Sequence, residues 1–442
     1  MRRFLRPSGS FTSLVSSTKR LKVALVVPGH QSRVVVGVSA SLMTSQLIMA
    51  ATAILSARWL GPAGKGLVAA ATTWGQLLGW LAGLGVALAI QVRVSEQPEE
   101  GRTAATSTAL GNGLLYSALG GGVVGLGAFF PLTSSLAHLG QDATAVIALA
   151  ILPLPLTVLA STLAYLLLAL GQNRRYSMSI LLGPLATLAL VVGTEVGGAL
   201  TPAVLMLCYL AGNVVVLLVS AHQLPWRSIH TDLAVLRQDI RFGVKLWLPG
   251  VMGLANLRLD LLVLTLFFTA DDLGLYSAAN NVLLPVSSIS LVIALITTSK
   301  AARLKAESGI GTATAAIWQN SRQAFFLSSV AGAICAVSVP VVVPVLLGDA
   351  YRPSIPLVWI MIAGIVARSV MGVVVAGANG MRRPRAGYIS EGAGLLATLV
   401  LLPVLLPRWG IVGAAVSSTA AYSVAAAASL WWLSTRAVER GQ

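Results

Sequence analysis

The amino-acid sequence predicts an all-α integral membrane protein with about twelve transmembrane helices. Of its 442 residues, 56% are apolar and only 10% are charged, whereas about a quarter of the residues in a soluble domain are charged. The mean hydropathy of +0.84 points the same way. Runs of about twenty mostly apolar residues, enough for a helix to cross the hydrocarbon layer, recur along the chain. Most of the outer surface is therefore expected to face lipid.

Twelve such runs divide the chain into two groups of six. Their expected bounds are 34–57, 67–92, 108–132, 143–170, 176–194, 200–221, 244–268, 274–299, 323–347, 355–379, 386–406 and 410–434. The longest inner connection, 222–243, separates an N-terminal lobe (34–221) from a C-terminal lobe (244–434). Residues 1–33 and 435–442 are expected to form cytoplasmic tails, the first of them basic.

The basic residues alternate between the two sides of the expected membrane. If both termini are inside, 24 Lys and Arg residues fall in tails and inner loops. Only four fall in outer loops: Arg58, Lys65, Arg352 and Arg408. Cytoplasmic loops carry such an excess, so the pattern predicts that both termini are cytoplasmic. It also explains the net charge of +16 without a nucleic-acid partner.

A short internal repeat indicates how the two lobes are related. The segment 66–71, Gly-Leu-Val-Ala-Ala-Ala, opens the second span, and 274–279, Gly-Leu-Tyr-Ser-Ala-Ala, opens the eighth. Each follows an outer loop, and the offset of 208 residues covers six spans. An even number of spans preserves orientation, so we expect a parallel repeat of two six-helix lobes around a central cavity.

The sequence offers little that is typical of an enzyme. It contains no glycine-rich loop ending in Lys-Ser or Lys-Thr, the signature of a nucleotide-binding P-loop. Cys208 and Cys335 both lie in apolar runs, and the four histidines are scattered, so neither a metal nor another cofactor is expected. The outer loops are all short. We therefore expect no catalytic activity.

Ionisable residues inside the spans are the main site candidates, because each costs on the order of 2.5–3.5 kcal/mol to insert. Asn256 and Asp260 in the seventh span are four residues apart and share a helix face, whereas Arg258 points about 200° away from Asp260. Asp260 is expected to meet polar partners, a cation or a proton. Arg368 lies mid-way along the tenth span. Glu391, about 9 Å from the inner end of the eleventh, is expected to be hydrated or paired with an inner-loop arginine. Structural interhelical hydrogen bonds or ion pairs remain the alternative for each.

Other polar and helix-breaking residues complete the candidate set. Five amides are expected to join helices by hydrogen bonds: Asn280, Asn281, Gln46, Gln76 and Asn112. Asn280 is also a further site candidate. Pro249-Gly250 and Gly253 in the seventh span, and Pro285 in the eighth, are expected to bend or unwind these helices. Spans one, two, seven and eight are thus expected to move or to line the cavity.

Three motifs resemble one membrane-protein family. They are Ser56-Ala-Arg-Trp-Leu-Gly-Pro-Ala-Gly-Lys-Gly66, Arg258-Leu-Asp260 followed by Asp272-Leu-Gly-Leu-Tyr-Ser-Ala-Ala279, and Trp409-Gly-Ile-Val-Gly-Ala-Ala415. They resemble polysaccharide and O-antigen flippases of the multidrug/oligosaccharidyl-lipid/polysaccharide exporter superfamily. The resemblance spans about residues 34–434.

This resemblance implies a bacterial cytoplasmic-membrane protein that translocates an undecaprenyl-diphosphate-linked oligosaccharide by ion-driven alternating access. Arg258 and Arg368 would contact the diphosphate, since guanidinium holds phosphate oxygens in pairs. Asp260, with Asn256, would couple Na⁺ or H⁺. Membrane lipids, a glycan polymerase and glycosyltransferases are the implied partners. The chain has fewer intramembrane cations than some relatives, which argues against a highly anionic glycan.

Three other functions remain open at this point. A multidrug or cation antiporter of the same fold would be expected to have more acidic and aromatic cavity residues. A polysaccharide polymerase or ligase would be expected to have a sizeable outer loop. A non-transporting scaffold for glycan enzymes is the third alternative.

Overall fold

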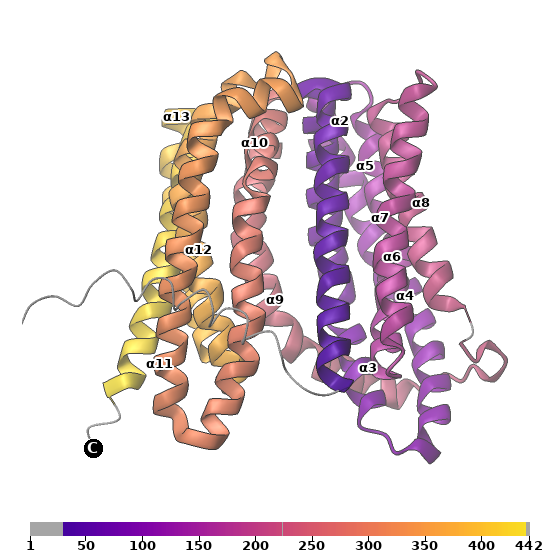
Figure 1. The fold of residues 1–442 in the computed structure, drawn as a ribbon. Helices are drawn as coiled ribbons and strands as arrows, with labels where there is room; N and C mark the ends of the chain where they lie inside the picture. Colours follow the sequence, from indigo (N-terminus) through magenta and orange to yellow (C-terminus); the bar gives the residue numbers. More distant parts are fainter. Residues whose placement is uncertain (1–29, 223, 439–442) are drawn as a thin grey trace, which may run out of the picture.

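The computed structural model describes residues 30–222 and 224–438, and within them it is all-helical (Figure 1). The N-terminal bundle contains α2 (His30–Gly83), α3 (Val86–Ser95), α4 (Glu99–Ser135), α5 (Ala143–Ile151), α6 (Leu154–Ala169), α7 (Asn173–Val196) and α8 (Pro202–Ala221). The C-terminal bundle contains α9 (Leu233–Phe267), α10 (Ala270–Val282), α11 (Leu284–Leu347), α12 (Ile355–Gly380) and α13 (Arg385–Val438). The short 3₁₀ turns η1 (Ala137–Leu139), η2 (Trp226–Ser228) and η3 (Asp349–Ser354) connect them. Most of the predicted basic tail, residues 1–29, lies outside the described residues.

The described part of the chain crosses a membrane twelve times, as predicted. It has nine helical stretches that are long and apolar enough to span a bilayer. Three of them contain a glycine with a left-handed backbone where the chain turns: Gly61 (φ 69°), Gly309 (φ 83°) and Gly410 (φ 59°). Each of these stretches is therefore two spans joined by a tight turn that glycine adopts without a steric penalty.

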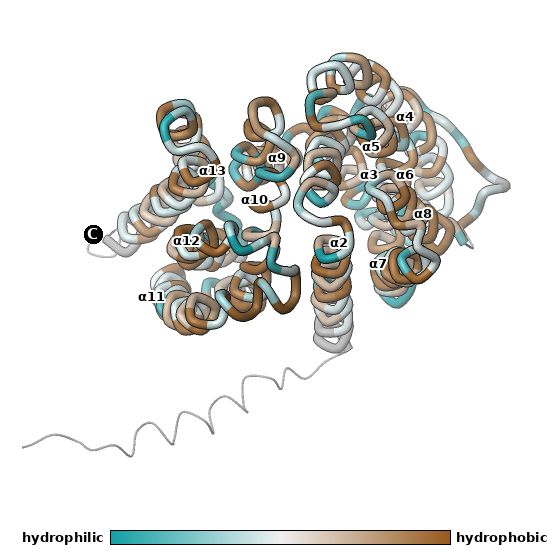
Figure 2. The backbone as a smooth tube through the Cα atoms, turned by 90° about the horizontal axis from the view of Figure 1, so that it is seen from above, coloured by the Kyte–Doolittle hydropathy of each residue, from teal (hydrophilic) through white to brown (hydrophobic). Residues whose placement is uncertain are grey.

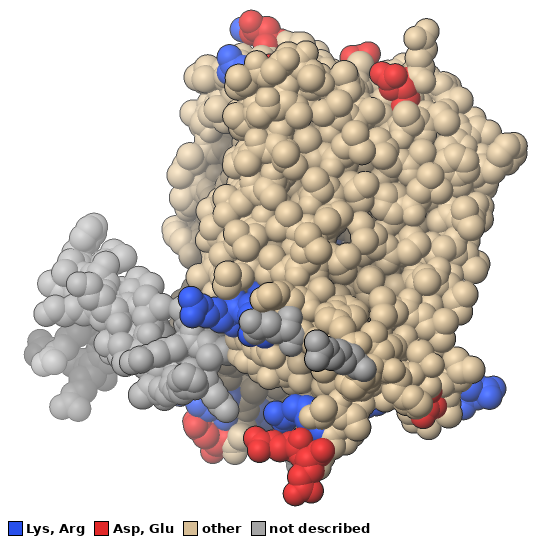
Figure 3. Space-filling view, turned by 90° about the vertical axis from the view of Figure 1, so that its right-hand side faces the viewer, with Lys and Arg blue, Asp and Glu red and all other residues tan. Residues whose placement is uncertain are grey.

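The surface agrees with a membrane setting. On the face shown in Figure 3, charged side chains gather at the two ends, and the belt between them is almost free of charge. Apolar residues dominate the helices (Figure 2), and Phe130, Val196 and Val337 are each more than 75% exposed. Both described chain ends lie at the same end of the molecule, which we call the basic end (Figure 1). The turns at Gly61 and Gly410 lie at the opposite end.

At the opposite end the two bundles meet through the glycines of the internal repeat. A Cβ atom added at Gly66 would stand 1.7 Å from the carbonyl oxygen of Ala270, and one added at Gly274 would stand 2.0 Å from that of Pro62. The backbones of α2 and α10 therefore touch directly, and each repeat glycine packs against the other half. The predicted repeat thus coincides with a direct backbone contact between the two bundles.

Hydrogen bonds reinforce this closed end. The Tyr351 hydroxyl donates to the Ala57 carbonyl at 2.9 Å, and Arg58 donates to the Val345 carbonyl at 2.6 Å. Both bonds join α2 to the C-terminal bundle. Because few polar partners exist at membrane depth, satisfied backbone carbonyls at this seam stabilise the closed arrangement.

The connection between the bundles is docked on α4. Buried Asn112 donates to the carbonyl of Asp232 and accepts from its amide, both at 3.0 Å. Asn112 thus joins α4 to the N-cap residue of α9, in agreement with the prediction that it connects helices. The Asp232 side chain caps α9 by accepting from Ala234 and Val235. Helix α9 therefore begins inside the predicted linker.

The expected helix breaks occur in one of the two spans. Helix α9 runs without interruption through Pro249-Gly250 and Gly253, so the seventh span does not unwind there, and a bend at these residues stays a prediction. The eighth span is interrupted at Leu283, between α10 and α11. Pro285 follows at once, and proline lacks the amide that would continue the helical ladder.

Gly66→Ala should prevent closure of the opposite end, because a methyl group has no room against the Ala270 carbonyl. In a Cys208→Ala/Cys335→Ala background, a cysteine at buried Ser277 should react with a membrane-impermeant thiol reagent at least several-fold faster. Gly122→Ala is the control, since nothing lies within 4 Å of its added Cβ. Equal labelling of the two glycine variants would contradict this role for Gly66.

A buried ion pair links α3 to α9 at the basic end. Arg93 holds Asp239 through two nitrogens, with Nε–Oδ1 and Nη2–Oδ2 both at 3.0 Å, and the Asp239 side chain is 4% exposed. Burial raises the pKa of the Asp239 carboxyl, while the hydrogen bond and charge of Arg93 oppose the rise. The positive charge of Arg93 thus compensates the negative charge of the buried Asp239 carboxylate.

Arg93→Ala should lower stability by about 3–5 kcal/mol at neutral pH, because it leaves an unpaired buried carboxylate. Because the pKa of the Asp239 carboxyl is raised, a fall in pH protonates and neutralises this unpaired group. The loss of stability caused by Arg93→Ala therefore becomes smaller as the pH falls. Thermal unfolding of purified protein at several pH values measures this. Arg93→Ala/Asp239→Asn should recover most of the loss, and a deficit that grows in acid would contradict the interpretation.

Candidate substrate and ion site

Helix α9 presents two different faces, and the predicted site residues divide between them. Asn256 and Asp260 are only 3% and 4% exposed. Both find partners on α13, so their shared face points into the C-terminal bundle. The predicted common face is confirmed, and the expectation that Asp260 meets polar partners is confirmed by these contacts.

Asp260 is held by hydroxyl groups from two other helices. Its Oδ2 accepts from the Ser418 hydroxyl of α13 at 2.7 Å and from the Tyr276 hydroxyl of α10. Its Oδ1 accepts from the backbone amide of Leu261. No basic side chain of the described residues lies within ion-pair distance of Asp260. The carboxyl group is therefore satisfied by neutral donors alone.

Asn256 lies one turn from Asp260 toward the basic end and contacts Glu391. Its Nδ2 donates to Glu391 Oε2 at 2.9 Å. A Cβ at Gly394 would come within 2.7 Å of the same nitrogen, so glycine leaves room for the amide. Asn256 Oδ1 is buried and lacks a hydrogen-bond partner. Glu391 thus makes the interhelical hydrogen bond that the sequence analysis left as the alternative, and no ion pair joins it to an inner-loop arginine of the described residues.

Arg258 lies on the face of α9 that contacts the N-terminal bundle. Eleven residues before it, Trp247 donates to the Trp80 carbonyl of α2 at 2.6 Å, and seven residues after it Thr265 accepts from Trp74 of α2 at 2.9 Å. At 100° per residue both positions lie within about 20° of Arg258. Arg258 therefore faces the seam between the bundles. Its Nε is buried and makes no hydrogen bond.

Arg368 of α12 lies within the C-terminal bundle. Its guanidinium carbon stands 5.1 Å from the centre of the Tyr422 ring of α13, a cation–π contact. Its Nη1 is buried and unpartnered. A Cβ at Gly364, one turn earlier, would meet Thr419 of α13 at 2.8 Å, so α12 and α13 pack closely beside the arginine.

These groups form a polar column through the C-terminal bundle. Its members are Glu391, Asn256, Arg368, Tyr422, Asp260, Tyr276 and Ser418. Counted along the helices, Glu391 lies about 9 Å from the basic end of α13, and Asp260 lies about 10 Å from the opposite end of α9. Tyr422 is within electrostatic range of Arg368, Asp260, Arg258 and Glu391. The column thus reaches most of the way across the expected membrane.

Sequence reasoning missed three members of this column. Tyr276 lies inside the second of the three family motifs. It follows Asp260 across the turn between α9 and α10, and this short spacing could have indicated that the two side chains meet. Ser418 and Tyr422 come from a span more than 150 residues away and carried none. Asn280 donates at 3.4 Å to the Tyr276 carbonyl of its own helix, so it supports α10 and does not reach Asp260.

Two of the predicted amides, Gln46 and Gln76, and the possible metal ligands can also be placed in the structure. Gln46 and Gln76 of α2 are exposed, so the prediction that they pack between helices is wrong. Within the described residues, no three His, Cys, Asp or Glu side chains gather as a metal site.

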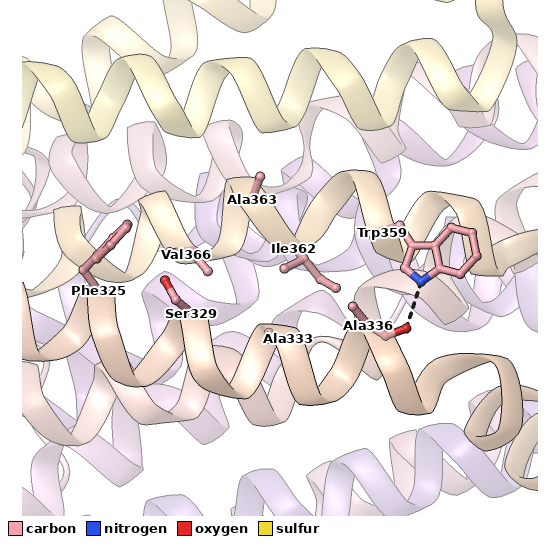
Figure 4. A pocket seen from close by; sticks show the side chains of 9 residues that line it. Phe325, Ser329, Ala333, Ala336, Trp359, Ile362, Ala363 and Val366 are labelled. Carbon is pink, nitrogen blue, oxygen red and sulfur yellow. Dashed lines mark hydrogen bonds between the residues drawn. The ribbon is translucent and has the colours of Figure 1, made fainter.

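A separate hollow lies between α11 and α12. Its volume is about 560 Å³, and small and aromatic residues line it, among them Phe325, Ala333 and Trp359 (Figure 4). The Trp359 indole donates to the Ala336 carbonyl at 3.0 Å. Val366 lines this hollow, while Arg368, two residues on, points about 200° away to α13. The apolar hollow and the polar column therefore lie on different sides of α12.

The sequence matches a family model described as "Polysaccharide biosynthesis protein" over residues 35–301. The chain belongs to this family. The matched region runs from the first span through the eighth and includes Asn256, Arg258 and Asp260. No curated relative matches the chain significantly.

Solved structures share the fold. The lipid II flippase MurJ in an inward closed conformation is 10% identical, with a TM-score of 0.75 over 90% of this chain and 87% of that one. An inward-facing multidrug resistance MATE family transporter of the MOP superfamily is 15% identical, with a TM-score of 0.73 over 92% and 98% of the two chains. An outward-facing one, also 15% identical, gives 0.64 over 92% and 96%. The predicted family and the two-lobed, twelve-helix fold are thereby confirmed.

Ser418→Ala should destabilise the protein by about 1–3 kcal/mol, because it removes a donor from a buried carboxyl group. In an Asp260→Asn background the same change should cost much less, which a double-mutant cycle of thermal unfolding detects. Ser429→Ala is the matched control: this serine is fully buried, and its hydroxyl bonds only to Ala426 of its own helix. Equal costs in both backgrounds would show that Ser418 does not act through Asp260.

Proposed function

We propose that the chain is a flippase that carries an undecaprenyl-diphosphate-linked oligosaccharide from the cytoplasmic to the outer leaflet of a bacterial cytoplasmic membrane. It would work by alternating access between its two bundles, without chemical conversion of the substrate. The single observation that carries this proposal is the position of Arg258, an arginine at membrane depth that faces the seam between the bundles with a buried, unpartnered nitrogen.

The chemistry of Arg258 suits an anionic headgroup. A guanidinium group binds two oxygens of a phosphate at once and keeps its charge in any protein environment. A second arginine, Arg368, lies in the polar column within the C-terminal bundle and would neutralise part of the headgroup's negative charge from there. Cationic drugs would be repelled by the two arginines, which disfavours the multidrug antiporter.

The shape supports an inward-facing resting state. The opposite end is closed by the Gly66 and Gly274 contacts, and the resemblance to the inward closed flippase (TM-score 0.75) and the inward-facing transporter (0.73) is greater than to the outward-facing transporter (0.64). Gln46 and Gln76 are exposed at membrane depth. Because an amide that faces hydrocarbon loses its hydrogen bonds to water, these residues fit a water-filled space better than a lipid surface. The excess of basic residues supports a cytoplasmic location for the basic end.

The polar column offers a route for ion coupling. The Asp260 carboxyl and the unpartnered Asn256 Oδ1 lie one turn apart on the same face, beside the Ser418 hydroxyl. Oxygen atoms of these kinds bind hard cations, and the carboxyl group can alternatively take a proton. We therefore propose that Na⁺ or H⁺ binds in the C-terminal bundle while the lipid-linked glycan binds between the bundles. A glycan polymerase and glycosyltransferases are the proposed partners.

Arg258→Gln and Asp260→Asn should each reduce surface polysaccharide at least tenfold in a host that lacks its own flippase, at normal membrane levels of the protein. Loss of a phosphate contact accounts for the first and loss of coupling for the second. Arg408→Gln, an exposed arginine at the opposite end, is the control and should complement fully. Full complementation by Arg258→Gln would overturn the assignment of the substrate contact.

The coupling ion can be identified by measuring the unfolding temperature of the purified protein in different salts. If Na⁺ binds, NaCl should raise the unfolding temperature relative to KCl at equal ionic strength, by the mass action of a ligand bound to the folded state only. Asp260→Asn and Asn256→Ala should abolish the difference. A wild-type protein indifferent to Na⁺ but stabilised at acidic pH through Asp260 would identify the proton, and indifference to both would refute coupling at this site.

A further inference from the structure

A second hollow, with a largely apolar lining and two charged side chains, lies at the basic end of the N-terminal bundle, away from the polar column. It is an open groove of about 420 Å³, bordered by the first turns of α4, the end of α6 and the connection after α8. Its lining residues are Glu99, Arg102, Thr103, Thr106, Leu170 and Pro225. None of these takes part in the proposed transport site.

The cavity holds one positive and one negative side chain that do not neutralise each other. Arg102 Nε is buried and has no hydrogen-bond partner, and no ion pair joins Arg102 to Glu99 or to any other described residue. The two positions are three apart on α4, which places their side chains next to each other on the helix surface. Buried donors in native proteins are rarely left unpaired, so the acceptor group of a bound ligand would satisfy Arg102 Nε.

The depth of the cavity matches the headgroup layer. Helix α4 has 37 residues, about 55 Å at 1.5 Å per residue, while the hydrocarbon layer is only about 30 Å thick. The apolar part of this helix begins near residue 108, so Glu99 and Arg102 lie just outside the hydrocarbon. Leu170 and Pro225 add apolar walls beside the charges. The combination suits the polar end of an amphiphile.

We propose that this cavity binds the headgroup of a zwitterionic phospholipid, with its phosphate on Arg102 and its ammonium group on Glu99. A charge-assisted hydrogen bond from guanidinium to phosphate satisfies the orphaned nitrogen. The carboxylate of Glu99 repels a purely anionic headgroup and attracts one that carries an amine. Phosphatidylethanolamine has both groups, joined by a two-carbon bridge short enough for neighbouring side chains.

The site also lies where the two bundles are connected. Beside the cavity, the Ser107 hydroxyl of α4 bonds that of Ser228 at 2.9 Å, and the His230 amide donates to the Ser107 carbonyl at 3.4 Å. A lipid that fills the cavity contacts both α4 and Pro225. Lipid binding therefore stabilises the docking of the connection on the N-terminal bundle.

Native mass spectrometry of the full-length protein in detergent tests this, with phosphatidylethanolamine and phosphatidylglycerol added in turn. The wild type should bind phosphatidylethanolamine several-fold more tightly. Arg102→Gln should weaken binding of both lipids about tenfold, the effect of one charge-assisted hydrogen bond. Glu99→Gln should retain phosphatidylglycerol binding and lose the preference for the amine. Controls are Glu100→Gln, the neighbouring acid that does not line the cavity, and Arg237→Gln, an exposed arginine of α9.

The lipid preference of the Glu99→Gln variant is the ratio of its affinities for the two lipids, measured on that one protein. It therefore does not depend on whether Arg102→Gln loses stability. Unchanged affinities in Arg102→Gln, or an unchanged lipid preference in Glu99→Gln, would overturn the proposal. Inorganic phosphate at millimolar concentration should not displace the lipid. Displacement by phosphate would identify a free-anion site instead of a lipid site.

Discussion

A carboxyl group inside a bilayer must receive its hydrogen bonds from the protein, and this constraint organises the C-terminal bundle. Water is scarce at that depth, and each unsatisfied polar group costs several kcal/mol. Asp260 is satisfied by Tyr276 of α10, Ser418 of α13 and its neighbouring amide. These bonds tie three helices together at one point. Any change in the charge of Asp260 alters the contacts among all three, which is the property that a coupling device needs.

In the proposed mechanism, helix α9 separates substrate contact and ion coupling by its two faces. The face with Asn256 and Asp260 points into the C-terminal bundle, and the face with Arg258 points to α2, between the contacts of Trp247 and Thr265. A substrate between the bundles can therefore meet Arg258 while an ion inside the bundle meets Asp260. Because α9 is an uninterrupted helix, a shift caused by one site moves the other as a rigid element.

The sequence was sufficient for the fold and for part of the site. Span number followed from apolar runs and loop charge, and the repeat at Gly66 and Gly274 located a direct backbone contact between the bundles. Asp260, Arg258 and Arg368 were identifiable because charged residues in apolar runs are rare. Tertiary packing decided the rest. Neighbours distant in sequence decide whether Pro249 unwinds α9 and which helix bonds to Glu391. They also decide that Ser418 and Tyr422 complete the column, because a single serine or tyrosine in an apolar span gives no signal of its partner.

The division of α9 into two faces can be measured directly by the reactivity of cysteines placed on each. In a background without Cys208 and Cys335, single cysteines at positions 258 and 256 would be exposed to a small hydrophilic thiol reagent. The proposed arrangement predicts rapid reaction at 258, which faces the seam between the bundles, and protection at 256, which is buried within one bundle. Protection at 258 together with reaction at 256 would contradict it.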